Sequence, residues 1–201
     1  KDINSDDVKE YKNEIIDIFK NHNQLRSEEE FKEIKINLHD TCKNCDLKLI
    51  KIFLSETINN KSNDLVFKID RANQTASLFK VNNNIEHLII PRSVEHESKD
   101  YLITSIISIE NSYVKTVNFV EDSTVTTIYR NAFFNSNIEE IYLPASLKEL
   151  KKGWHFGALF IKKIEISPSN DQFAFKDNKF LVGKSDPKSD GFDIILFVRR
   201  D

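Results

Sequence analysis

The spacing of apolar residues changes near residue 62, which divides the chain into two parts. Apolar residues recur at helical spacing over residues 8–19. Ser27 followed by Glu30 has the form of a capping box, although the segment that it begins ends in strand-like alternation. Residues 45–58, "CDLKLIKIFLSETI", are apolar nearly all round, as a buried helix is. The pattern therefore predicts a helical cap segment over residues 1–62.

The next segment, residues 65–81, has the period of a β-hairpin. Apolar and polar residues alternate in "LVFKID", and residues 71–74 have the composition of a turn. A second apolar set follows at Ala76, Leu78 and Val81. We expect this hairpin to cover the first unit of whatever structure follows it.

From residue 85 onward, one apolar spacing returns four times: a gap of three residues and then a gap of two. The four sets are Ile85, Leu88 and Ile90; Val114, Val117 and Phe119; Ile138, Ile141 and Leu143; and Ile161, Ile164 and Ile166. Their starts at 85, 114, 138 and 161 are 29, 24 and 23 residues apart, within or just above the range of leucine-rich repeats. The gap of two is typical of a strand that points two side chains into a core. The spacing predicts four adjacent parallel strands of one solenoid, with an ordinary β-sandwich as the alternative.

A second apolar pattern follows each predicted strand and strengthens the repeat interpretation. It is carried by "YLITSI", "STVTTIYRNAF" and "ASLKELKKGWHF". The predicted fold class is α+β, with the helical cap on residues 1–62 and a repeat domain on residues 63–201. Because the strand-like residues 192–198 have no closing segment after them, we expect further repeats to follow in the natural protein.

Residues 108–156, "SIENSYVKTVNFVEDSTVTTIYRNAFFNSNIEEIYLPASLKELKKGWHF", resemble BspA-like leucine-rich repeats. These occur in bacterial surface proteins, including treponemal ones, and in large sets in protists such as trichomonads. The resemblance is closest at residues 125–133, which end in the "AF" pair, and at residues 138–150. Gly153-Trp154 departs from it by replacing a second "AF" pair. The tail, "NKFLVGKSDPKSDGFDIILFVRR", resembles a hairpin insertion of that family, and the whole resemblance covers about residues 85–201.

The resemblance implies a function in binding rather than in catalysis. BspA-like proteins are associated with attachment, so the expected function is a non-catalytic protein interaction or adhesion module. The implied partner is a protein of the host surface or matrix, and the implied location is the cell surface or outside the cell. Some protist members are intracellular, which keeps an intracellular scaffold protein with a cytoplasmic partner as the alternative.

The predicted strands also place a set of side chains on the outer face of the sheet. Residues that alternate with the inward ones point outward and form rows across stacked strands. The candidate partner-binding residues are His87, Ile89, Thr116, Asn118, Glu140, Tyr142, Lys163 and Glu165. Tyr142 is the expected anchor, because aromatic residues are enriched among binding hot spots. The alternative is that this face is only solvated.

Metal or redox chemistry is the competing class, at "NLHDTCKNC". Cys42 and Cys45 have the spacing of half a zinc site, with His39 three residues upstream. The second half of such a site is missing from the sequence. A dithiol at the start of a helix is the other option. We favour two free thiols that pack a helix, and we expect no metal and no cofactor.

Composition narrows the remaining classes. The 201 residues carry 29 basic and 32 acidic side chains, a net charge of −3, and no basic block for nucleic acid. No apolar run reaches the roughly 20 residues of a membrane span. Four glycines leave no phosphate-binding loop, and no Ser/His/Asp arrangement stands out. These observations agree with a protein that is not an enzyme.

Overall fold

The computed structural model describes residues 55–60, 62, 64–82, 84–109, 111 and 113–199. The chain divides into two compact units, Lys1–Ser55 and Glu56–Asp201, and the fold described below is that of the second unit. The helices predicted within residues 1–54 lie outside the described residues. The division predicted after residue 62 stays a prediction.

The described residues form strands and turns and contain no helix, so the predicted α+β class is wrong and this part is an all-β solenoid. The first strand, β1 (Glu56–Asn59), occupies residues that were expected to end the helical cap. Within it Ile58 is buried between exposed Thr57 and Asn59. β1 pairs antiparallel with β2 (Leu65–Asp70). Pairing between strands, which the helical pattern of the preceding residues did not reveal, decides the local structure here.

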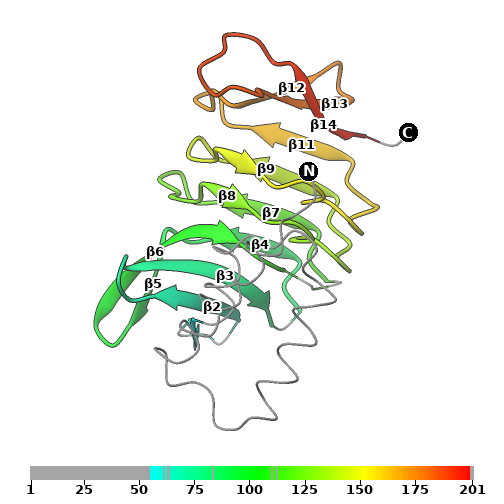
Figure 1. The fold of residues 1–201 in the computed structure, drawn as a ribbon. Coiled ribbons are helices and arrows are strands. Elements are labelled where there is room, and N and C mark those ends of the chain that lie inside the picture. Colours follow the sequence, from blue (N-terminus) through cyan, green and yellow to red (C-terminus); the bar gives the residue numbers. More distant parts are fainter. Residues whose placement is uncertain are drawn as a thin grey trace, which may run out of the picture. The chain divides into compact units, whose positions relative to one another are not determined.

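The predicted four-stranded parallel arrangement is confirmed. β4 (His87–Ile90), β7 (Thr116–Phe119), β9 (Glu140–Leu143) and β11 (Lys163–Ile166) form one sheet in the order β11-β9-β7-β4, which we call the parallel sheet (Figure 1). Leu88 pairs with Val117, Val117 with Ile141, and Ile141 with Ile164. All four side chains are buried. The gap-of-three, gap-of-two spacing thus marks one strand per coil.

A second sheet, which we call the mixed sheet, runs β1-β2-β3-β6-β8-β10, with β5 paired to β6. Its strands β3 (Thr75–Val81), β6 (Lys99–Ile106), β8 (Thr127–Ile128) and β10 (Glu149–Leu150) are parallel to one another. β2 and β3 form the predicted hairpin, with its turn at residues 71–74. The second apolar pattern of the sequence therefore corresponds to this second sheet.

The first coil contains an extra hairpin, formed by β5 (Ser93–His96) and β6. Its two-residue turn, Glu97 and Ser98, has positive φ at both residues, 51° and 59°. Arg71, in the turn between β2 and β3, contacts this hairpin through Glu97 and contacts β1 through Glu56, each at 2.7 Å. The same arginine therefore joins the beginning of the unit to the inserted hairpin.

The C-terminal part forms a third sheet, which we call the antiparallel sheet. It contains β12 (Phe173–Lys176), β13 (Phe180–Gly183) and β14 (Ile194–Val198), in that order. β13 and β14 pair antiparallel, which confirms the hairpin expected for the tail. The pairing skips Leu196, because Leu181 faces Phe197 and Val182 faces Ile195.

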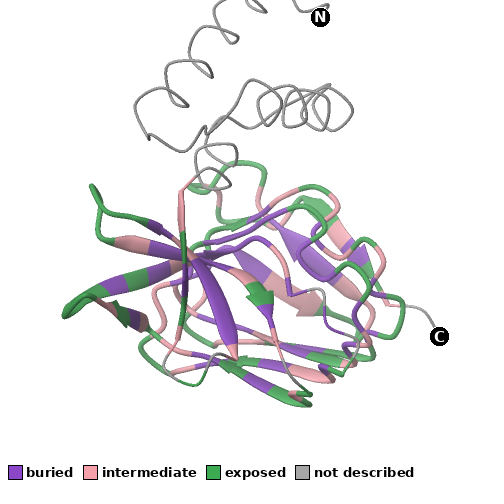
Figure 2. Ribbon diagram, turned by 90° about the horizontal axis from the view of Figure 1, so that it is seen from below, coloured by how far each residue is buried: buried purple, intermediate pink, exposed green. Residues whose placement is uncertain are grey.

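The core is built from the inward residues of the sheets, and buried positions alternate with exposed ones along their strands (Figure 2). Most of these inward residues are Ile, Val and Leu. Large rings fill the turn side: Phe133 meets Trp154 edge-on at 5.7 Å between centroids, and Phe197 of β14 lies 6.2 Å from Trp154. The tail sheet is thereby packed against the turn of the preceding coil.

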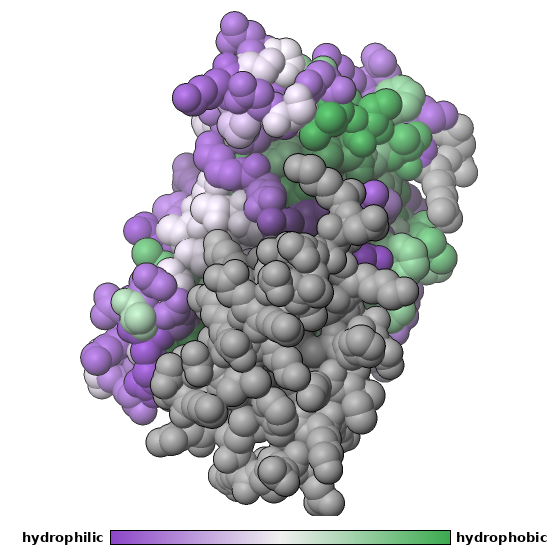
Figure 3. All heavy atoms as spheres, in the orientation of Figure 1, coloured by the Kyte–Doolittle hydropathy of each residue, from purple (hydrophilic) through white to green (hydrophobic). Residues whose placement is uncertain are grey.

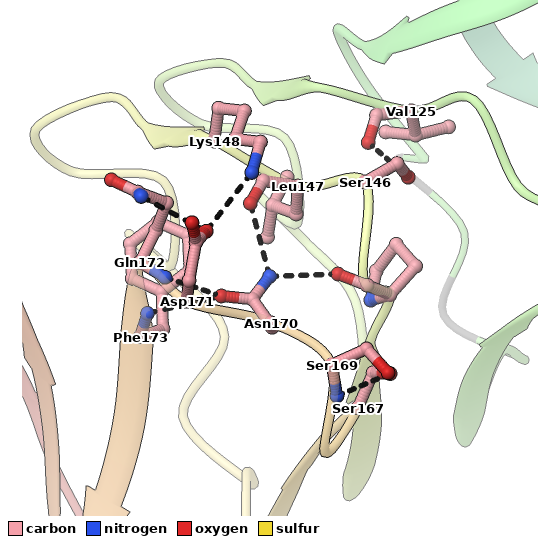
Figure 4. Close-up of polar contacts among 11 residues, drawn as sticks. Val125, Ser146, Leu147, Lys148, Ser167, Ser169, Asn170, Asp171, Gln172 and Phe173 are labelled. Atoms are coloured by element: carbon pink, nitrogen blue, oxygen red, sulfur yellow. Dashed lines mark hydrogen bonds and ion pairs between the residues drawn. The ribbon is translucent and has the colours of Figure 1, made fainter. Parts of the chain in front are cut away.

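Polar side chains tie successive coils together just after each strand of the parallel sheet. Thr124 donates a hydrogen bond to the carbonyl of Ile103 at 2.9 Å, and Ser146 donates to that of Val125 at 2.8 Å. Asn170 stands at the equivalent place one coil later (Figure 4). Its amide donates to the carbonyls of Pro144 and Leu147, and its Oδ1 accepts from the backbone N–H of Gln172 and Phe173. Asn170 therefore closes the last coil and sets the start of β12.

Candidate functional site

The eight candidate residues lie in two rows across the outer face of the parallel sheet. In the first row His87 pairs with Thr116, Thr116 with Glu140, and Glu140 with Lys163. In the second row Ile89 pairs with Asn118, and Tyr142 with Glu165. The structure therefore brings together all eight residues that the sequence singled out for this face.

The half of the face on β4 and β7 carries no acid or lysine within the two rows. Ile89 is 60% exposed, an unusual position for an aliphatic side chain at the centre of a short strand. A ring nitrogen of His87 lies 3.0 Å from the hydroxyl of Thr116, which fixes these two neighbours relative to each other. Asn118 beside them is exposed. This half offers one apolar side chain surrounded by neutral hydrogen-bonding groups.

The half on β9 and β11 is charged. Lys163 lies 2.5 Å from Glu165 on its own strand and 4.0 Å from Glu140 on the next strand. The hydrogen bond to Glu165 raises the pKa of Lys163 above its ordinary value. Because these groups are exposed, their pairs contribute little to stability, and they remain available to a charged partner.

A further charged row lies at the start of the same strands and was missed by the sequence analysis. Glu139 accepts a hydrogen bond from Lys162 at 2.8 Å and lies 3.5 Å from Lys115. The bond from Lys162, with the charge of Lys115 nearby, lowers the pKa of Glu139. The signal was present as acid and base at equivalent positions of successive repeats. This row borders the candidate face.

Tyr142 is placed differently from the expectation. It is half-buried and packs against the hydrophobic core, whereas the prediction treated it as a free outward anchor. Neighbouring strands cover part of a large side chain even when its Cβ points outward. Ile89 is therefore the more accessible apolar group of the face.

The other candidate group, Cys42, Cys45 and His39, lies outside the described residues. Within the described part of the chain, no group of three or more His, Cys, Asp or Glu side chains is arranged to hold a metal ion. A search of the same part finds no helix with the length and apolar character for crossing a membrane.

An exposed aromatic group on the turn side was also missed. Phe134 and Phe156 come from successive coils, and their rings stack at 6.2 Å with an interplanar angle of 8°. Leu159 and Phe160 follow in the same turn and are also exposed. In the sequence, "AFF" and "HFGALF" resemble core segments, and nothing in their spacing separates the inward phenylalanine from the outward one.

No protein-family model matches the sequence, and no curated protein matches it. Two solved structures are similar to the chain. One is the crystal structure of the pneumococcal vaccine antigen PcpA, with 18% identity and a TM-score of 0.38 over 58% of this chain and 39% of that one. The other is a leucine-rich cell-surface protein of Faecalibacterium prausnitzii, with 13% identity and a TM-score of 0.30 over 65% of this chain and 59% of that one.

The chain thus spans about two fifths and three fifths of the lengths of these two structures. Both likenesses are distant and concern the fold alone. What describes this chain is its own geometry: stacked coils with one strand each in the parallel sheet, which is a repeat protein of the leucine-rich type at the level of its architecture.

Proposed function

We propose that this chain is a non-catalytic protein-interaction module that binds its partner through the outer face of the parallel sheet. The observation that carries the proposal is the registered pair of rows on β4, β7, β9 and β11, with Ile89 exposed at one end and Lys163 and Glu165 at the other. Rows of this kind give a continuous surface that is fixed by backbone pairing.

The chemistry of the two halves indicates the kind of partner. An exposed aliphatic residue among neutral donors and acceptors suits the apolar centre of an interface, whereas the charged half and the row at Glu139 suit its polar rim. A folded protein surface with an apolar centre and opposite charges at one side complements this face. The resemblance to BspA-like repeats supports attachment at the cell surface or outside the cell as the setting.

The test compares two apolar residues of nearly equal exposure. Ile89 on the proposed face is 60% exposed, and Phe156 on the turn side is 59% exposed. Partners are captured from cell or matrix extract with the wild-type chain and identified, and their affinity for purified Ile89→Ala and Phe156→Ala is then measured. We expect Ile89→Ala to weaken binding about tenfold, as the loss of a hot-spot side chain does, and Phe156→Ala to leave it unchanged.

Circular dichroism and thermal melting of both variants check that the fold is intact. Tyr142→Ala is unsuitable as a probe, because Tyr142 packs against the core and its loss would affect folding as well as binding. If Phe156→Ala weakens capture and Ile89→Ala does not, the binding surface lies on the turn side and the proposal is wrong. Turnover of a substrate by the purified chain would contradict its non-catalytic part.

A further inference from the structure

The antiparallel sheet ends at β14, one of whose edges has no partner strand. β13 occupies the other edge, through pairs such as Leu181 with Phe197. The backbone bonds that flank this strand, from Asp193 to Gly183 and from Arg199 to Lys179, also go to the β13 side. In the described part of the chain no strand pairs with the second edge. Such an edge presents a row of N–H and C=O groups that can pair with another strand.

The side chains of β14 make this edge adhesive. Ile195 is 64% exposed, and Ile194 and Val198 are exposed as well. In the space-filling view a hydrophobic surface lies at the upper right, in the region where β14 runs in Figure 1 (Figure 3). The five residues of the strand include no charged residue, which is the usual protection of an edge strand against pairing.

The charges that flank the strand have opposite signs at equal distances from its centre. Asp193 comes three residues before Leu196, and Arg199 comes three residues after it. The backbone N–H of Ser185 donates to Asp193 Oδ1, and the hydroxyl of Ser185 to Oδ2; the hydroxyl bond in particular lowers the pKa of Asp193, so this carboxyl is ionised at neutral pH. The side chain of Arg199 has no ion pair within the described residues.

We propose that β14 pairs with β14 of a second copy of this chain, antiparallel and with the two-fold axis at Leu196. In this register Ile194 faces Val198, and Ile195 faces Phe197. Asp193 of each copy then faces Arg199 of the other, so both ends of the strand pair are electrostatically matched. A two-fold interface requires a self-complementary patch, and the order of charge, apolar residues and opposite charge along this strand provides one.

Leu196 itself fits the position on the axis. It has no partner on β13, and its side chain lies over Gly183, where an added Cβ would come within 2.7 Å of Leu196 Cδ1. The extra residue therefore packs toward its own sheet. The two three-stranded sheets would join into one six-stranded sheet, and the exposed face of the parallel sheet would remain free for another partner.

The experiment measures self-association of the full chain by sedimentation equilibrium into the high micromolar range. The wild-type chain is expected to dimerise, and Ile195→Lys to abolish the dimer by placing a charge in the strand pair. Asp193→Lys and Arg199→Glu each turn two attractive pairs into repulsive ones. Each is expected to weaken dimerisation about tenfold.

Mixing the last two variants gives the decisive readout. In a mixed dimer Asp193 faces Arg199 at one end, and the new lysine faces the new glutamate at the other, so association should return to within about twofold of the wild-type value. Ser185→Ala is the matched control, because it removes a hydroxyl contact of Asp193 but keeps the carboxylate. It should dimerise as the wild-type chain does.

Two results would overturn the proposal. One is a wild-type chain that stays monomeric throughout the concentration range. The other is a mixture of Asp193→Lys and Arg199→Glu that associates no better than either variant alone, because that excludes the stated register. Melting curves of every variant verify that a loss of dimer is not a loss of fold.

Discussion

The same coils cross the solenoid twice, and the two crossings differ in how they are held. In the parallel sheet each coil contributes four residues to a strand, and these pair in one register from β4 to β11. In the mixed sheet the corresponding strands β8 and β10 have only two residues each. Backbone pairing therefore positions one side of each coil, whereas the other side needs additional contacts.

Those contacts are side-chain ones. On the side of the mixed sheet and the turns, hydroxyl and amide groups of Thr124, Ser146 and Asn170 bond to carbonyls of the preceding coil. The rings of Phe133 and Trp154 fill the space behind them. One architecture thus combines a side that tolerates many outward residues with a side that depends on a few specific ones.

The largest expected effect is in the parallel sheet. Ile141 is 2% exposed and lies in the buried row of β9. Ile141→Asp buries an unpaired carboxylate and should cost several kcal/mol, enough to unfold the solenoid. Circular dichroism and urea titration measure the loss. The matched control is Asn118→Asp on the exposed face, which should change stability by no more than about 0.5 kcal/mol.

On the turn side, Trp154 should give the next largest effect. Trp154→Ala removes a buried ring that contacts Phe133 and Phe197, and should cost about 3–5 kcal/mol. Its buried Nε1 has no hydrogen-bond partner among the described residues. Trp154→Phe should therefore cost clearly less than Trp154→Ala in urea unfolding, because no hydrogen bond is lost. Equal losses would show that an interaction of the indole N–H matters.

A smaller effect is expected from the polar contacts between coils. Asn170→Ala removes two donated and two accepted hydrogen bonds and leaves the carbonyls of Pro144 and Leu147 without this partner. We expect a loss of about 1–3 kcal/mol. Ser146→Ala, which removes one bond, should cost about 1 kcal/mol. A larger loss for Ser146→Ala than for Asn170→Ala in thermal unfolding would contradict this ranking.

The smallest effect is a pH dependence near Asp171. Hydrogen bonds from Gln172 and Lys148 lower the pKa of Asp171 to about 2, below its ordinary value of 3.8. The carboxylate therefore stabilises the fold above about pH 4, and this contribution is lost as the pH falls toward 2. Asp171→Asn should reduce the steepness of acid unfolding in this window. The difference between wild type and variant in melting temperature, followed from pH 5 to pH 2, is the measurement.

The parts of the fold that could be predicted are those with a local pattern. Residues such as Val117 and Ile141 alternate with polar ones over a whole strand, so the parallel sheet and the hairpin of β2 and β3 were found. The two-residue strands β8 and β10 are too short to show a period, and their parallel pairing could not be inferred. The helical pattern was extended through residues 56–59, where pairing with β2 decides the structure.

The candidate face shows the same limit. Alternation correctly predicted which residues share the outer side, because direction follows from strand geometry. Exposure depends on neighbours in other strands, and this is why Ile89 is more accessible than Tyr142 although both point outward. The open edge of β14 depends on which strands pair, and the apolar residues 194–198 alone give no sign of an unpaired edge.

The hairpin of β5 and β6 has a consequence for engineering. The paired residues of the two sheets are separated by 18 positions in the first coil, from His87 to Ser105, but by 11 in the next, from Thr116 to Thr127, and by 9 in the third, from Glu140 to Glu149. The registers of both sheets are the same across this change of length. The molecule thus already carries a foreign-looking loop at one corner, and the turn at Glu97 and Ser98 is the place where a grafted peptide could be displayed without a change in the repeat that supports it.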